Sequence, residues 1–236
     1  MIDKQDKHTS LSAPGRIRRT QAERSQETRL RVCIATIEAL CEVGYEKIST
    51  PLIAEKANIS RGALTHQFPT RNDLLVAAYQ HLIGGWENDF LFSNGLKLVR
   101  LEIDVLIDVF WDKIFATRHY IAAMELMLAA RLDNDLGVAL REVLRAWIRR
   151  RDSIALEIIG ASKDDDNARL FIQLNLSVLR GIALHQSVDD DSISSQRLLE
   201  LWKSIARGVQ RDRIGVEGRP AVKGESPFSL QYRPER

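Results

Sequence analysis

Residues 50–68 hold two helices of only about two turns each with a tight turn between them, and few folds accommodate such an arrangement. Thr50 is a suitable N-cap for the first helix, and Pro51 suits the first helical position, where its missing N–H is not needed. The helical run LIAEKA then ends before Asn58. Because asparagine tolerates the left-handed conformation, Asn58 is expected to form the tight turn.

The second short helix has equally clear boundaries. Ser60 is its predicted N-cap, the segment RGALTHQF forms the helix, and Phe68-Pro69 ends it, because the residue before a proline is disfavoured in helical angles. Thr70 is expected to cap the following helix, with Asp73 at the third position completing a capping box. Two short helices joined by a tight turn describe a helix-turn-helix.

This second short helix carries the small and polar side chains that fit a DNA major groove. Arg61, Thr65 and His66 lie on one side of it by their spacing, and Gly62 lets the backbone approach a phosphate closely. A lone helix histidine is more often packed or solvated than bound to a base, so both interpretations stay open for His66. Three residues of this segment are expected to face the interior: Ala63, Leu64 and Phe68.

The rest of the chain is predicted to be helical, which makes the protein all-α with about nine helices. The first helix begins near Gln21 and ends at Gly44, a residue suited to a left-handed cap. Its predicted apolar stripe comprises Leu30, Cys33, Ile34, Ile37, Leu40 and Cys41. Further helices are expected over residues 71–92, 96–115, 118–131, 134–160, 165–187 and 193–210.

The helix at residues 96–115 is apolar nearly all round its circumference. Only Asp104, Asp108 and Asp112 interrupt it, at a spacing of four residues, as an acidic stripe. A helix of this kind is expected to lie centrally in its domain with one edge in contact with water.

Composition and charge are those of a globular protein. The 236 residues are 44% hydrophobic and 28% charged, with a formal net charge of +2. Residues 16–31 nevertheless carry six arginines against two glutamates, a local charge of +4. This suits an arm that contacts phosphate, although a solvated, disordered terminus is the alternative. Residues 1–20 and 211–236 lack periodicity and are predicted to be a disordered basic arm and a flexible tail.

The two cysteines argue for a reducing compartment. Cys33 and Cys41 would lie about 12 Å apart on one helix, too far for a disulfide, so reduced thiols and a cytoplasmic protein are expected. The N-terminal residues lack a signal-peptide pattern, and no apolar run is long enough to span a membrane. The sequence also predicts no metal site and no cofactor.

The run GYEKISTPLIAEKANISRGALTHQFPTRNDLL resembles the DNA-binding segment of TetR-family transcriptional regulators. The family pattern is matched by Gly44-Tyr45 at the end of the first helix, Ile53-Ala54 in the second, and Ile59-Ser60-Arg61-Gly62 at the turn. Phe68, Arg71 and Leu74 match the end of the recognition helix and the start of the fourth helix. The resemblance implies that residues 21–70 form a DNA-binding domain and residues 71–210 a helical domain for ligand binding and dimerisation.

The resemblance also implies roles for individual residues. Ser49, Thr50 and Arg71 would bind phosphate, and Arg61, Thr65 and His66 would face the groove, with Arg61 contacting guanine or phosphate. The implied core is Leu52, Ile53, Ala57, Ile59, Leu64 and Phe68. Thr65 departs from the family pattern, which usually has a tyrosine there. One contact that positions the protein on DNA is then lost or replaced.

The helix at residues 165–187 has two apolar faces and is expected to be buried on both sides. One face comprises Phe171, Leu174, Val178 and Ile182, and the other Ile172, Leu176, Leu179 and Ala183. Together with the helix at 193–210 it would form half of a two-fold, four-helix interface. Ordinary monomer core is the alternative.

A small-molecule pocket is expected between the middle helices. Its candidate lining residues are Trp111, Phe115, Met124, Met127, Trp147 and Asn175. Asn175 has the alternative of a structural hydrogen bond. Arg141, Arg145 and Arg149, with the neighbouring Arg150 and Arg151, are expected to form a solvated basic face.

No catalytic motif is present, so the sequence predicts a regulator rather than an enzyme. The expected activity is that of a repressor that binds a palindromic site on double-stranded DNA as a homodimer and is released by a small-molecule effector. An activator or an architectural protein that binds DNA without an effector is the alternative.

Overall fold

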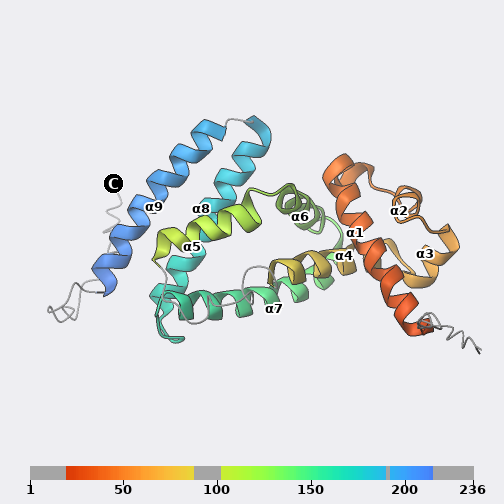
Figure 1. The fold of residues 1–236 in the computed structure, drawn as a ribbon, viewed down its shortest axis with the longest axis horizontal. Coiled ribbons are helices and arrows are strands. Elements are labelled where there is room, and N and C mark those ends of the chain that lie inside the picture. Colours follow the sequence, from red (N-terminus) through yellow and green to blue (C-terminus); the bar gives the residue numbers. More distant parts are fainter. Residues whose placement is uncertain (1–19, 88–101, 190–191, 215–236) are drawn as a thin grey trace, which may run out of the picture.

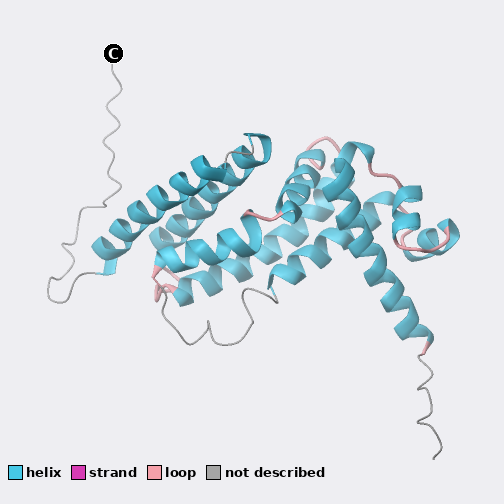
Figure 2. Ribbon diagram, turned by 45° about the horizontal axis from the view of Figure 1, so that its top comes forward, coloured by secondary structure: helices cyan, strands magenta, loops and turns pink. Residues whose placement is uncertain are grey.

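The computed structural model describes residues 20–87, 102–189 and 192–214. All regular elements within these ranges are helices, with no strand (Figure 1, Figure 2). The prediction of an all-α fold is confirmed. Helices α1–α3 lie at one end of the molecule, and α8 and α9 lie at the other (Figure 1). Most of the predicted arm and tail falls outside the described residues.

Helix α1 (Gln21–Lys47) begins at a capping box that joins Thr20 and Glu23. The Glu23 N–H donates to Thr20 Oγ1 at 3.2 Å, and the Thr20 N–H donates to Glu23 Oε2 at 2.7 Å. At Gly44 the backbone leaves helical angles, with φ 74° and ψ 172°, and a last turn follows. The predicted break at Gly44 is therefore present, although the helix does not end there.

The predicted apolar stripe of α1 is only partly correct. Leu30 and Ile34 are 44% and 46% exposed, whereas the buried residues of α1 are Val32, Cys33, Ala35, Thr36, Ile37, Ala39 and Leu40. The reason is that α1 packs against several helices at once, namely α2, α3, α4 and α6. Small residues are buried on several sides, so no single stripe describes the helix.

The N-terminal helices share a small core. Its other helices are α2 (Thr50–Lys56), α3 (Arg61–Gln67) and α4 (Arg71–Trp86). The largest side chains in this core include Ile37, Leu40, Ile53, Leu64, Phe68 and Leu74. Of the core residues implied by the family resemblance, Leu52 and Ile59 are only half-buried.

The C-terminal helices surround a larger core. They are α5 (Ile103–Phe110), a π-helical turn (Trp111–Phe115), α6 (Arg118–Ala129), α7 (Asn134–Ile158), α8 (Asp166–Asp189) and α9 (Ser192–Ile214). Helix α9 thus runs beyond the predicted end at residue 210. Helix α4 belongs to both cores, because Leu74 and Ala78 pack in the small one while Tyr79 and Trp86 pack in the large one.

The acidic stripe of α5 is partly exposed to water, as predicted, and it also contacts α9. Lys203 of α9 lies 2.9 Å from Asp108, and Arg207 of α9 lies 3.6 Å from Asp104. The carboxylates of Asp104 and Asp108 therefore attach α5 to α9 while remaining partly exposed, and Asp112, in the π-helical turn, is exposed. The start predicted for this helix, residues 96–101, lies outside the described residues.

Helix α8 has one exposed side rather than two buried ones. The side chains at Leu170, Leu174, Leu184 and Val188 are 44–85% exposed in the single chain, so the burial predicted for Leu174 is not reached within it. The two predicted apolar faces are otherwise buried apart from Val178, which is half-buried.

Candidate DNA-binding surface and ligand cavity

The turn between α2 and α3 has the geometry predicted for it. Asn58 has a positive φ of 52°, and the Ile59 N–H donates to the Ala54 carbonyl at 3.0 Å. Ser60 caps α3, because its Oγ accepts from the Ala63 N–H at 3.1 Å. These local bonds fix the direction in which α3 leaves α2.

Helix α3 presents a polar face to solvent. Arg61, Gly62, Thr65 and His66 are all exposed, and Leu64 is the only buried residue of the helix. The Thr65 hydroxyl donates to the Arg61 carbonyl at 3.1 Å, within its own helix. The structure differs from prediction at one position: Ala63 is also exposed. Phe68 follows α3 and is buried with Leu64.

The start of α2 also differs from prediction by one residue. Ser49, rather than Thr50, is the N-cap, and its Oγ accepts from the Leu52 N–H at 3.4 Å. Two adjacent hydroxyl residues both suited this position, and the extended backbone of Ser49 (φ −137°) decides between them. Both side chains are exposed at the start of α2.

The first turns of α1 hold the end of α3 in place, a feature that sequence reasoning missed. Arg29 Nη1 donates to the Gln67 carbonyl at 2.7 Å, and its guanidinium lies 4.3 Å from the centroid of the Phe68 ring. Ser25 hydrogen-bonds to Gln67 as well. Arg29 belongs to the basic segment predicted to contact phosphate, but here it binds the carbonyl of Gln67, the last residue of α3. A cation is favourable at that helix end.

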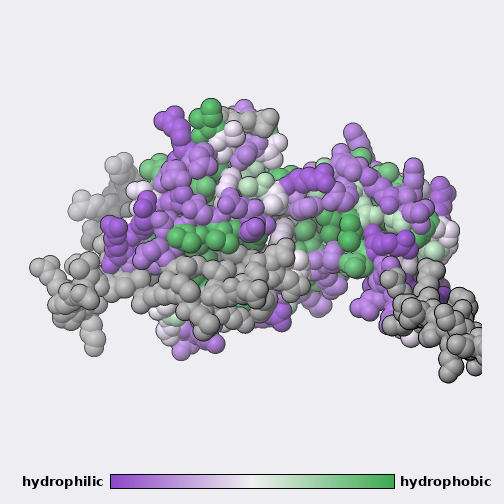
Figure 3. Space-filling model, viewed as in Figure 1, coloured by the Kyte–Doolittle hydropathy of each residue, from purple (hydrophilic) through white to green (hydrophobic). Residues whose placement is uncertain are grey.

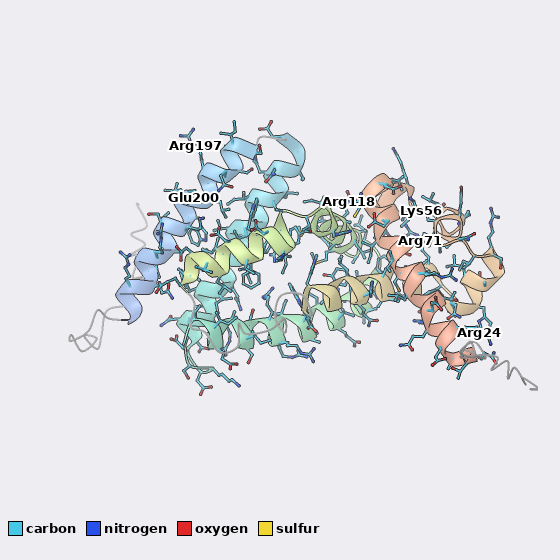
Figure 4. The ribbon with its side chains drawn as sticks, in the orientation of Figure 1. Arg24, Lys56, Arg71, Arg118, Arg197 and Glu200 are labelled. Carbon is cyan, nitrogen blue, oxygen red and sulfur yellow. The ribbon has the colours of Figure 1, made fainter. Side chains whose placement is uncertain are left out.

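Arg71 is half-buried against α1. Its Nη1 donates to the Tyr45 hydroxyl at 3.0 Å, its Nη2 donates to the Tyr45 carbonyl at 3.3 Å, and its guanidinium lies 4.6 Å from the centre of the Tyr45 ring. Figure 4 shows Arg71 between α4 and α1. A guanidinium has five N–H donors, so donors remain for a further acceptor.

A cavity of about 530 Å³ lies among α4, the π-helical turn, α6, α7 and α8. Four of the six predicted lining residues are on its wall: Phe115, Met124, Met127 and Trp147. Its wall also includes Tyr79, Trp86, Tyr120, Arg151 and Arg180, which were not predicted. The spacing of apolar residues along the chain does not predict that the arginines and tyrosines among them line a cavity.

Trp111 and Asn175 do not line this cavity. Asn175 Nδ2 donates to the Phe171 carbonyl at 2.7 Å, and Asn175 Oδ1 accepts from Trp202 Nε1 at 2.8 Å. Asn175 therefore has the structural role that was its alternative. Trp111 is buried in the large core.

The basic face predicted on α7 does not include Arg151. This side chain is 5% exposed and forms two hydrogen bonds to Asp152 Oδ1, of 3.0 Å and 2.7 Å. Burial lowers the pKa of Arg151, and the adjacent Asp152 charge opposes that effect. Arg141, Arg145, Arg149 and Arg150 are exposed as predicted.

Comparison with known proteins gives a consistent result. Residues 35–78 match the family described as bacterial regulatory proteins, tetR family. An HTH-type transcriptional regulator of Mycobacterium tuberculosis is 29% identical over 194 residues, which cover 81% of this chain and 99% of the relative. The HTH-type transcriptional regulator CymR of Pseudomonas putida is 29% identical over 201 residues, covering 80% and 94% of the two chains.

Solved structures share the fold. A TetR transcription regulator from Haloarcula marismortui superimposes with a TM-score of 0.63 at 18% identity, over 78% of this chain and 98% of its own. The chain belongs to the TetR family of transcriptional regulators. Its relatives are named as regulators of transcription and not as enzymes, so this TetR-family protein is a helix-turn-helix regulator rather than an enzyme.

In this TetR-family protein, α6 connects the cavity to the DNA-binding helices. Glu38 of α1 forms an ion pair with Arg118 and a hydrogen bond with His119 Nε2, the latter at 3.2 Å. The hydrogen bond from His119, together with the Arg118 charge, holds the pKa of Glu38 below its usual value. Figure 4 shows Arg118 where α6 meets α1. A shift of α6 would therefore act directly on α1.

The described residues contain no helix that is both long and apolar enough to cross a bilayer. They also contain no cluster of histidine, cysteine and acidic side chains arranged to hold a metal ion.

Proposed function

We propose that this TetR-family protein is a dimeric repressor that binds a palindromic operator and is released from it by a small-molecule effector. The observation that carries the proposal is the exposed polar face of α3, which is fixed by Ser60 at one end and by Arg29 at the other. A short, rigid helix with such a face suits insertion into the major groove.

The contacts proposed for DNA follow from this placement. Arg61, Thr65 and His66 face the groove, and Gly62 allows the start of α3 to approach the backbone. Ser49 and Thr50 contact phosphate from the start of α2, and Arg71 contacts it with the donors that Tyr45 leaves available. The Thr65 hydroxyl still has a lone pair to accept with, although its proton is engaged.

The proposed dimer forms through α8 and α9. Exposed residues recur on α8 at alternating steps of four and three: Leu170, Leu174, Ser177, Gly181, Leu184 and Val188. The same spacing occurs on α9 at Leu198, Leu201, Ile205 and Gly208. Apolar residues at this period form the seam of packed helices. Figure 3 shows a mainly hydrophilic surface over α9 on this face, with an isolated hydrophobic spot near the end where α8 joins α9.

The effector would occupy the cavity beside α6. Its volume of about 530 Å³ lies in the range of small-molecule sites. The solved relative EbrR, described as a multidrug binding protein, has been crystallised with ethidium and superimposes with a TM-score of 0.56. An effector that fits only one position of α6 would shift the population away from the DNA-competent spacing of the two α3 helices.

The experiment that tests this function is selection of bound sequences from random DNA, followed by titration of the selected site. Enrichment of a palindrome with half-sites about 34–36 Å apart is expected. Arg61→Ala should weaken binding by about 1–3 kcal/mol and relax base preference at one position. Arg145→Ala, which removes an exposed arginine from α7, is the control and should leave affinity unchanged.

An absence of any enriched sequence, or an Arg61→Ala variant whose operator affinity and base preference are both unchanged, would contradict the assignment of α3. Screening for compounds that release the operator tests the effector part separately. If none releases it, the regulator acts without an effector.

A further inference from the structure

The cavity beside α6 is lined by aromatic side chains that pack on one another in tilted pairs. The ring centroids of Trp86 and Trp147 are 6.0 Å apart, those of Trp86 and Tyr120 are 6.2 Å apart, and those of Phe115 and Tyr120 are 4.6 Å apart. These flat apolar surfaces favour a ligand with an aromatic ring. A cluster of aromatic rings can also bind an organic cation. The charged residues that line the cavity therefore decide whether a cationic aromatic ligand would be accepted.

Two arginines and no carboxylate line the described wall of the cavity. The charge of Arg151 is compensated by Asp152, and its guanidinium already lies over the Trp147 ring, 4.6 Å from the centroid. One aromatic face that a ligand cation would use is therefore occupied by a protein cation. A cationic ligand would also meet the Arg180 charge, for which no carboxylate partner is present among the described residues.

Arg180 differs from Arg151 in having no carboxylate partner among the described residues. Its Nε donates to the Tyr120 hydroxyl at 3.0 Å, which holds the guanidinium at the cavity wall while its terminal nitrogens stay available. Arg180 is exposed, so a ligand can reach it. A guanidinium with two free N–H groups matches the geometry of a carboxylate.

A further donor in the wall lacks a partner. Trp147 is 9% exposed, and its indole N–H has no acceptor among the described residues. An unpaired buried donor is uncommon in folded proteins. Arg180 and Trp147 are thus two residues of the cavity wall that carry available N–H donors, and no residue of the described wall carries a negative charge.

We propose that the cavity binds a small aromatic carboxylate, with the Arg180 guanidinium paired to the carboxylate and the ring held among Trp86, Trp147 and Tyr120. The inference rests on the proposed function, because the cavity is its effector site. It adds the chemical class of the effector to that proposal.

The test compares head groups on a constant ring. Benzoate, naphthoate and biphenylcarboxylate are titrated into the full chain by calorimetry at neutral pH, each beside its carboxamide and its aminomethyl analogue. At least one carboxylate should bind about 10- to 100-fold more tightly than its carboxamide, as expected for a charge-assisted pair. The positively charged aminomethyl analogue should bind most weakly of the three.

Variants then locate the recognising group. Arg180→Gln should reduce affinity for the carboxylate by about 10- to 100-fold and leave affinity for the carboxamide within about threefold. Retained carboxamide binding shows that the variant is folded. Arg145→Gln, an exposed arginine on α7 outside the cavity, is the matched control and should bind the carboxylate normally.

The proposal is overturned if no carboxylate binds more tightly than its amide, or if the aminomethyl compounds bind best. This comparison uses the unchanged protein, so it decides the question even if Arg180→Gln does not fold. Calorimetry needs no DNA. Carboxylate binding without operator release would support this inference and contradict only the effector part of the proposed function.

Discussion

The Glu125 carboxylate of α6 accepts a hydrogen bond from the Tyr45 backbone N–H at 2.9 Å, and this bond joins α6 to the last turn of α1. It forms at the point where α1 is broken by Gly44, whose φ of 74° and ψ of 172° are open almost solely to glycine. The break exposes the Tyr45 N–H, which an uninterrupted helix would use internally.

Gly44→Ala should therefore destabilise the protein. A Cβ at this position would lie 3.0 Å from Glu125 Oε2 and would be held in a conformation that L-residues avoid. We expect the free energy of unfolding to fall by about 1–3 kcal/mol, measured by urea denaturation at a fixed protein concentration.

Gly84→Ala is the matched control for this substitution. Gly84 lies within α4, and an added Cβ would meet nothing within 4 Å. Alanine is the better helix former by up to about 1 kcal/mol, so this variant should be as stable as the parent or more so. Equal effects of the two substitutions would show that the Gly44 geometry is not required.

The ion pair between Asp108 and Lys203 should contribute measurable coupling between α5 and α9. Lys203 Nζ lies 2.9 Å from Asp108 and 2.6 Å from Glu200, and the Lys203 side chain is only 11% exposed. In a double-mutant cycle of Asp108→Asn and Lys203→Met, we expect a coupling energy of about 0.5–1 kcal/mol. Added salt should reduce it, because the carboxylate is half exposed to solvent. If the effects of the two single substitutions on the free energy of unfolding are additive, the ion pair does not contribute to the attachment of α5 to α9.

Local chemistry explains which parts of the structure could be predicted. The turn at Asn58, the cap at Ser60 and the capping box of Thr70 with Asp73 depend on residues at most three positions apart, and all are present. The choice between Ser49 and Thr50 as the cap of α2 could not be made, because proline is tolerated at either of the first two helical positions.

Contacts between residues far apart in the sequence explain which features could not be predicted. The partners of Arg29 and Arg180 could not be predicted, because Gln67 and Tyr120 lie on other helices, 38 and 60 positions away in the sequence. Asn175 binds Trp202 of α9, 27 positions along the chain. The spacing of apolar residues along the chain predicts the helices and the buried core. It does not predict which group a polar side chain contacts.

Cys41 should react slowly with alkylating reagents. Burial raises the pKa of its thiol to about 11, and burial raises the pKa of Cys33 too. A thiol with a raised pKa keeps its proton, so the reactive thiolate of Cys41 at pH 8 is about 100-fold scarcer than at the ordinary thiol pKa. In a Cys33→Ala variant, labelling by iodoacetamide should be slower by about that factor than in the urea-unfolded chain. Equal rates would mean that α6 does not cover this thiol in solution.

Leu201→Glu should convert the proposed dimer to a monomer. Leu201 is 60% exposed in one chain and lies at the centre of the α9 seam, where a partner chain would bury it. A carboxylate there would lose its hydration without gaining a counter-ion, which costs several kcal/mol. Light scattering at micromolar concentration should show a dimer for the parent and a monomer for the variant.

Leu132→Glu provides the control for this substitution, because Leu132 is 95% exposed but lies between α6 and α7, away from the seam. It should remain dimeric. Operator affinity should fall with Leu201→Glu alone, since a monomer binds each half-site separately and loses the high effective concentration of the second α3 helix. A parent protein that is monomeric at micromolar concentration would refute the interface. A Leu201→Glu dimer would show that the contact lies elsewhere on the molecule.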